Sequence, residues 1–232
     1  VFPNRLDAVG SRDLVAEYVF CCTQAMVDLS RLSEELVLWA TSEFGWATFG
    51  DALTTGSSAL PQKKNPDIAE LARGKAAGAI GSLTSIMALQ KALPLAYNRD
   101  LQEDKEHVFS VDDALGGTLE AITAMLSSAS FHPPRPSSWT MALDFAEVLV
   151  DRGVPFRRAH EAVGRLVSSL LAEGRTLDDV SADDLSAADA LFEADDVALA
   201  DAAESIRRRV SSGGGSFESV GEQIRALQRL LS

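Results

Sequence analysis

The chain has 232 residues, of which 46% are hydrophobic and 24% are charged, proportions typical of a globular protein that can bury a sizeable core. Its formal net charge of −13 argues against nucleic acid as a partner, because phosphate binding depends on a surplus of Lys and Arg. No apolar run approaches the roughly 20 residues that span a bilayer, so no membrane partner is expected.

The first predicted element is a long helix over residues 11–44, with Ser11 as its N-cap. Its apolar stripe has alternating spacings of four and three, which is typical of a helix packed in a bundle. The stripe consists of Val15, Val19, Cys22, Met26, Leu29, Ser33, Leu36 and Ala40. Cys21 and Cys22 are adjacent and would point about 100° apart on this helix, which disfavours a disulfide and favours a reducing, cytoplasmic location.

Residues 45–66 lack this period and are rich in Gly, Thr, Ser and Pro. They predict a loop that ends with Asn65 as an N-cap and Pro66 at the first position of a second helix. That helix ends before Pro94, and the polar segment 97–106 leads into a third helix. Because the chain begins without Met and enters its first helix almost at once, we expect it to be a fragment of a longer protein.

The proline-rich stretch 133–136 is the predicted boundary between two domains, a central helical-bundle portion over 1–132 and a small helical C-terminal domain over 133–232. Shorter amphipathic segments are predicted as helices at 141–152, 156–172 and 220–231. Neither an alternating strand pattern nor an internal repeat stands out. The predicted fold class is therefore all-α, with a long-helix bundle followed by a small helical domain.

Residues with chemical potential concentrate in segment 56–67, Gly-Ser-Ser-Ala-Leu-Pro-Gln-Lys-Lys-Asn-Pro-Asp. Lys63 and Lys64 precede a helix N-terminus, where the macrodipole is already positive and backbone N–H groups point outward. Ser57 and Ser58 add hydroxyl groups, so the segment suits a ligand that carries carboxylates. By composition alone, a solvated loop with two surface lysines is the more ordinary interpretation.

The order of residues in this segment resembles the signature of the fumarase and aspartase superfamily: Gly-Ser-Ser, two apolar or small residues, Pro, any residue, Lys, any residue, Asn. Together with segment 97–106, Tyr-Asn-Arg-Asp-Leu-Gln-Glu-Asp-Lys-Glu, it resembles argininosuccinate lyase in particular. The resemblance continues through 154–161 and fades in the acidic C-terminal region. It implies a cofactor-independent enzyme that eliminates fumarate from argininosuccinate and leaves arginine, built as a helical homotetramer with shared active sites.

The resemblance also implies roles for single residues. Ser57 matches the catalytic base, and Lys63, backbone N–H groups and the helix N-terminus could stabilise its alkoxide. Glu70 matches the carboxylate that orients a histidine of the family, and that histidine lies upstream of these residues. The residues that match substrate contacts are Ser58, Asn65, Tyr97, Gln102 and Lys105. Because the family's N-terminal regions are absent, we expect this chain alone to be inactive.

Three alternatives remain open at this point. The first is another lyase of the superfamily, namely a fumarase, an aspartase or an adenylosuccinate lyase. The second is a structural protein that keeps the bundle without activity, as lens crystallins of this family do. The third is a helical oligomerisation module.

Other polar residues receive more ordinary interpretations. The acidic residues of two segments are predicted to be solvated charges on helix starts and faces. These residues are Glu103, Asp104, Glu106, Asp183, Asp184, Asp195 and Asp196. The three histidines, His107, His132 and His160, lack the spacing of metal ligands, so no metal site is predicted.

Overall fold

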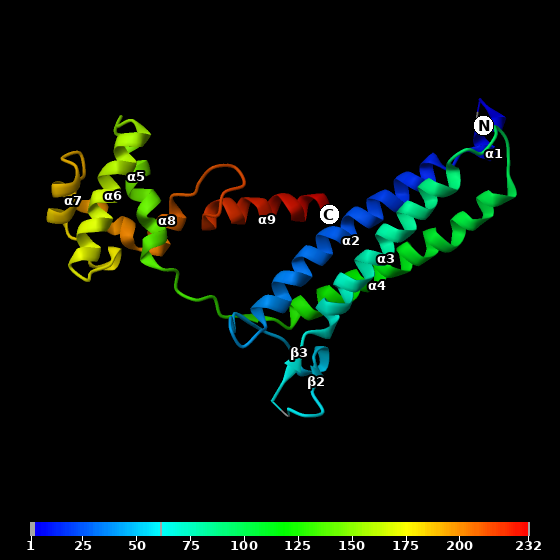
Figure 1. The fold of residues 1–232 in the computed structure, drawn as a ribbon, viewed down its shortest axis with the longest axis horizontal. Helices are drawn as coiled ribbons and strands as arrows, with labels where there is room; N and C mark the ends of the chain where they lie inside the picture. Colours follow the sequence, from blue (N-terminus) through cyan, green and yellow to red (C-terminus); the bar gives the residue numbers. More distant parts are fainter. Residues whose placement is uncertain (1–2, 61, 232) are drawn as a thin grey trace. The chain divides into compact units, whose positions relative to one another are not determined.

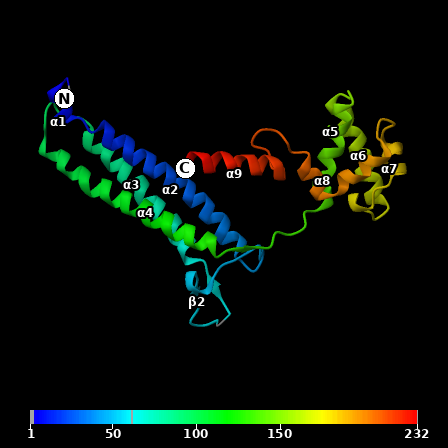
Figure 2. The same cartoon turned by 180° about the vertical axis from the view of Figure 1, so that it is seen from behind.

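The computed structural model describes residues 3–60 and 62–231, and the chain divides into two compact units, Val1–Pro134 and Arg135–Ser232. In the first unit three long helices lie side by side, as both opposite views show (Figures 1 and 2). They are α2 (Asp13–Trp39), α3 (Asp67–Gln90) and α4 (Asp104–Ser127). The predicted all-α class with a long-helix bundle is confirmed.

The bundle holds together through apolar stripes on the three helices. Val19, Met26 and Leu36 of the predicted α2 stripe are completely buried. Burying a side chain of that size stabilises the fold by about 1.5–3 kcal/mol. The facing stripe of α3 is built mostly from alanines, which let the backbones of α2 and α3 approach closely. Its buried apolar residues are Ala69, Ala72, Ala76, Ala79 and Ile86.

The first long helix is shorter than the predicted range 11–44. It begins at Asp13 and ends at Trp39, and Arg12 rather than Ser11 is the residue that precedes it. The Ser11 hydroxyl accepts a hydrogen bond from Asp13 N–H at 3.2 Å. Ser11 therefore still satisfies one free backbone donor of the helix, although it lies one residue before the N-cap position. The predicted extension at the C-terminal end was wrong, because the chain turns there into a short strand pair.

A short helix, α1 (Arg5–Gly10), precedes α2 and was not predicted. The Asn4 side chain caps it by accepting hydrogen bonds from Leu6 and Asp7 N–H at 3.1 and 3.3 Å. A helix this short leaves too few turns for an apolar stripe to stand out in the sequence.

Two small antiparallel strand pairs occur in the described part of the first unit, where none was predicted. Strand β1 (Ala47–Thr48) pairs with β4 (Ser130–Phe131), which ties the chain after α2 to the chain after α4. Strand β2 (Thr55–Gly56) pairs with β3 (Lys64–Asn65). Strands of two residues cannot reveal an alternating pattern. Since Asn65 belongs to β3, Pro66 takes the N-cap position of α3 that was predicted for Asn65.

The described part of the second unit consists of shorter helices, the first three of which contribute residues to its apolar core. These are α5 (Ala142–Asp151), α6 (Phe156–Ala172), α7 (Ala182–Ala188), α8 (Ala202–Arg207) and α9 (Phe217–Leu231). The bounds of α6 agree with the prediction, and α9 begins three residues earlier than predicted. Short 3₁₀ segments occur in both units, at Asp51–Leu53, Arg99–Glu103, Ser138–Met141, Leu177–Asp179 and Ala194–Ala200. The largest completely buried side chains of this core are Phe145, Leu149, Leu177 and Leu185.

Two acidic residues of this unit that were predicted to be solvated are ion-paired instead. Asp184 accepts hydrogen bonds from both terminal nitrogens of Arg175, at 3.1 and 2.5 Å. Asp196 accepts from both terminal nitrogens of Arg152, at 2.5 and 3.0 Å. The Arg175 guanidinium and the Ser181 hydroxyl hold the pKa of Asp184 well below its usual range. The prediction failed because both arginines come from segments that only folding brings near.

These contacts predict that the second unit loses stability in acid. A carboxyl group whose pKa is lower in the folded state than in the unfolded state stabilises the fold when it is ionised. For Asp this stabilisation is complete above the unfolded pKa of about 3.9. It is lost as the pH falls from there toward the folded pKa. Replacing Asp184 with Asn should therefore lower the Tm of the second unit at neutral pH by about 5 °C, the shift that corresponds to ~1 kcal/mol for a unit of this size. It should also flatten the dependence of Tm on pH below about pH 5.

Circular dichroism melts at a series of pH values measure both effects. The matched control is Asp183→Asn, which changes an exposed carboxyl on the same helical turn and should retain the pH slope of the unmodified chain. An Asp184→Asn variant with that same slope would contradict the prediction.

Candidate active site

Segment 56–67 forms a hairpin that leads into the N-terminal end of α3 (Figure 1). Thr55 pairs with Asn65 and Gly56 pairs with Lys64, so residues 57–63 connect the two strands. Pro61, which belongs to the signature, lies outside the described residues. The hairpin brings the Gly-Ser-Ser residues and the lysines to the same end of the bundle.

The Ser57 side chain lies within a cluster of backbone N–H donors. Its Oγ accepts hydrogen bonds from Ala59 N–H and Leu60 N–H, each at 3.2 Å. Ser57 is partly buried, whereas Ser58 is exposed. Two backbone dipoles directed at one oxygen stabilise negative charge on that oxygen. These two donors would stabilise an alkoxide on this oxygen if one formed.

The two lysines of the hairpin have different surroundings. Lys64 forms an ion pair with Asp51, which partly compensates its charge. Both lysines line a cleft of about 660 Å³ between the hairpin and the C-terminal end of α2, and Asn65 and Glu70 line it with them. Ser57 is not among the described residues that line this cleft. The cleft thus unites three of the predicted site residues and leaves the Ser57 hydroxyl outside its lining.

The second predicted segment forms its own cluster. Lys105 Nζ donates a hydrogen bond to Gln102 Oε1 at 2.7 Å, and Gln102 Nε2 donates to the Tyr97 hydroxyl at 2.9 Å. Gln102 belongs to a 3₁₀ turn, and Lys105 belongs to the first turn of α4. The fold brings these three side chains together, and all three remain exposed to solvent.

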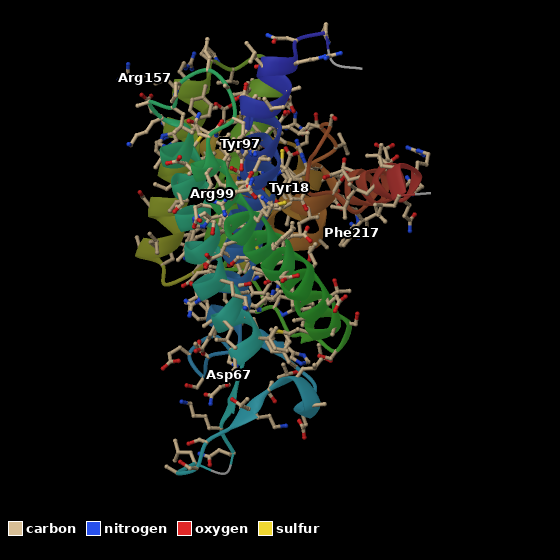
Figure 3. The ribbon with its side chains drawn as sticks, turned by 90° about the vertical axis from the view of Figure 1, so that its right-hand side faces the viewer. Tyr18, Asp67, Tyr97, Arg99, Arg157 and Phe217 are labelled. Carbon is tan, nitrogen blue, oxygen red and sulfur yellow. The ribbon has the colours of Figure 1, made fainter. Side chains whose placement is uncertain are left out.

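The hairpin and this cluster lie at opposite ends of α3. The helix has 24 residues, which corresponds to a length of about 36 Å. In Figure 3, Asp67 lies beside the hairpin, and Tyr97 lies toward the far end of the bundle. A small substrate bound at Ser57 therefore cannot reach Lys105 of the same chain.

Two residues near Lys105 were missed or misread in the sequence. Asp104 was predicted to be a solvated charge, but it is only 6% exposed, and its Oδ2 accepts a hydrogen bond from Arg12 Nε at 2.5 Å. The prediction was wrong because Arg12 stands 92 positions away, and no local pattern pairs residues at that distance. Glu103 and Glu106 are exposed, as predicted.

In the part of the chain that the structure describes, no group of three or more His, Cys, Asp and Glu side chains could hold a metal ion. Within residues 3–60 and 62–231, no helix combines the length and the hydrophobicity needed to cross a membrane.

Comparison with known proteins agrees with the fold. Residues 1–81 match the family described as Lyase, and residues 139–207 match the family described as Argininosuccinate lyase C-terminal. A structure of an EDDS lyase variant with bound fumarate aligns with a TM-score of 0.81 at 26% identity, covering 100% of this chain and 49% of that chain. The 3-carboxy-cis,cis-muconate lactonizing enzyme of Pseudomonas putida shares the fold, with a TM-score of 0.62 at 20% identity over 83% of this chain and 45% of that chain.

The long-helix bundle and the match of residues 1–81 to the lyase family place this chain in the fumarase and aspartase superfamily of lyases. Argininosuccinate lyase of Frankia casuarinae is 48% identical over 99% of this chain and 51% of its own length, and that of Anaeromyxobacter sp. (strain K) is 47% identical over 98% and 50%. The chain belongs to the argininosuccinate lyase family. It spans about half the length of the curated relatives that it matches.

Proposed function

We propose that this chain is the C-terminal half of an argininosuccinate lyase, a carbon-nitrogen lyase that eliminates fumarate from argininosuccinate and leaves arginine. The observation that carries the proposal is the pair of backbone N–H groups on Ser57 Oγ, in a hairpin that also contains Lys63. The relatives of about 47% identity that bear this name support the choice of substrate over those of other lyases in the superfamily.

In the proposed reaction Ser57 Oγ removes a proton from the succinyl carbon next to a carboxylate. The electron pair of that C–H bond forms the double bond of fumarate, and the C–N bond to the guanidino nitrogen breaks. The leaving nitrogen receives a proton from an acid group that the family resemblance assigns to residues outside this chain. Lys63 and the N-terminus of α3 stabilise the extra negative charge that develops on the carboxylate during proton removal.

The remaining site residues bind and orient in this proposal. Asn65 offers an amide to the substrate, and Glu70 orients a histidine from the missing part. Lys105 pairs with a substrate carboxylate, while Gln102 and Tyr97 hold the polar groups of the amino-acid end. All proposed steps use side chains and backbone groups of the protein.

We also propose that the protein is a cytoplasmic homotetramer whose active sites are shared among subunits. The separation of about 36 Å between the two ends of α3 supports shared sites, because one subunit can offer only one of its two clusters to a given substrate. Large apolar side chains exposed along α3 and α4 support close association with further helices. They include Leu71, Ile80, Met87, Phe109 and Leu119.

The test measures fumarate by its absorbance, with the purified chain alone and with the chain completed by a separate N-terminal half. We expect no fumarate from the chain alone, because the acid group is missing. The completed enzyme should release fumarate from argininosuccinate, and not from malate, aspartate or adenylosuccinate.

Each other outcome points to one of the alternatives. Release of fumarate by the isolated chain would contradict the proposal that other segments supply part of the site. Turnover of a different substrate would assign the chain to another lyase of the superfamily. A completed assembly without activity on the whole panel would favour a structural role.

A further inference from the structure

A buried ion pair joins the N-terminal end of α2 to the start of α4. Arg12 Nε donates to Asp104 Oδ2 at 2.5 Å, and Arg12 Nη1 donates to the Ser11 carbonyl at 2.9 Å. The side chains of Arg12 and Asp104 are only 17% and 9% exposed. A buried carboxylate is unfavourable unless a cation and hydrogen bonds compensate for its lost hydration. Arg12 therefore compensates part of the cost of placing the Asp104 carboxylate at this position.

The hydrogen bond from Arg12 reaches only one oxygen of the carboxylate. Asp104 Oδ1 is buried and has no hydrogen-bond partner among the described residues. The Lys105 ammonium lies 3.6 Å from this oxygen and also donates to Gln102 Oε1 at 2.7 Å. The Lys105 ammonium thus lies between the charged Asp104 carboxylate and the neutral Gln102 amide oxygen. Since an ammonium has three N–H donors, one remains for a substrate carboxylate.

The ion pair and Lys105 line the same cleft, which has a volume of about 510 Å³. Val15, Val108 and Phe109 contribute apolar walls to it. A cleft of this size with apolar walls and a few polar groups suits a small molecule, and charges act more strongly there than in open water. Any redistribution of charge between Arg12, Asp104 and Lys105 will therefore change how the cleft binds an anion.

We propose that Arg12 is a positioning residue for Lys105. By neutralising Asp104, Arg12 keeps the Lys105 ammonium bonded to Gln102 and available to a substrate carboxylate. Without Arg12, Asp104 would be a buried carboxylate whose nearest cation is Lys105, and attraction would draw the ammonium away from Gln102. This inference rests on the proposed role of Lys105 as a substrate contact.

The test is a rescue experiment in the complete lyase. Arg12→Met is expected to raise the KM for argininosuccinate about tenfold and to leave kcat within about twofold, because a charge-assisted contact to the substrate is weakened. Adding Asp104→Asn removes the uncompensated carboxylate, so the double variant should return to within about threefold of the original KM. Arg31→Met, which removes an exposed cation elsewhere on α2, should leave KM unchanged.

The split between KM and kcat distinguishes positioning from structural support, because loss of folded enzyme lowers the apparent kcat and leaves the KM of the molecules that remain folded unchanged. If Arg12→Met does not fold, Arg12→Lys replaces it, and the variant is compared with and without Asp104→Asn. Arg12→Lys alone should raise the KM about threefold, and the added Asp104→Asn should remove that rise. An unchanged KM, or a double variant no better than the single one, would overturn the proposal. A complete lyase that releases no fumarate before any substitution would instead overturn the proposed function.

Discussion

Replacing Ser57 with alanine is expected to lower the kcat of the completed lyase by a factor of about 10²–10⁴, the usual contribution of a positioned general base. The KM for argininosuccinate should change little, because the Ser57 oxygen acts mainly in the transition state and not in holding the bound substrate. Steady-state release of fumarate measures both constants, and calorimetric titration of the inactive variant measures binding directly.

The structure offers a matched control for this change. Ser168 lies exposed on α6, and its hydroxyl donates to the Gly164 carbonyl at 2.8 Å, so Ser168→Ala removes the same atom far from the hairpin in the chain. That variant should retain full turnover. Near-normal kcat in Ser57→Ala would eliminate Ser57 as the base, and a loss of binding in place of kcat would assign it to substrate contact.

Mixed tetramers of two defective chains are expected to regain activity. Ser57→Ala damages the hairpin end of α3, and Lys105→Met damages the opposite end, about 36 Å away. If each site takes its two ends from different subunits, random mixing of equal amounts leaves about one site in four with both ends intact. Each variant alone should be nearly inactive at low substrate, and the mixture should reach about a quarter of the original rate.

The control mixture combines Ser57→Ala with Lys63→Met. Both changes lie in one hairpin, so no subunit in this mixture has an intact hairpin and no activity should return. The variants are unfolded together, refolded and assayed for fumarate release. If the first mixture remains as inactive as the control mixture, both ends of a site come from the same subunit, and the proposal of shared sites is wrong.

Local patterns were sufficient to predict most of the helical structure. The spacings of three and four in α2 identified Val19, Met26 and Leu36 as buried, and the bounds predicted for α6 agree with the structure. Such patterns work because a helical turn relates residues only a few positions apart, so neighbouring residues already contain the information. The same patterns could not reveal the two-residue strands, which are defined by their partners and not by their own sequence.

For the candidate site, the sequence by itself determined which side chains are present: Ser57 and Lys63 in one segment, and Gln102 and Lys105 in another. Only the tertiary structure decided how they are arranged. It gathers Lys63, Asn65 and Glu70 around one cleft beside the C-terminal end of α2, and it separates the two segments by the length of α3. It also turns Asp104 from a predicted solvated charge into the buried partner of Arg12. The physical reason is that hydrogen bonding and burial depend on which distant segments pack together, and a pattern that repeats over three or four residues carries no information about contacts across 92.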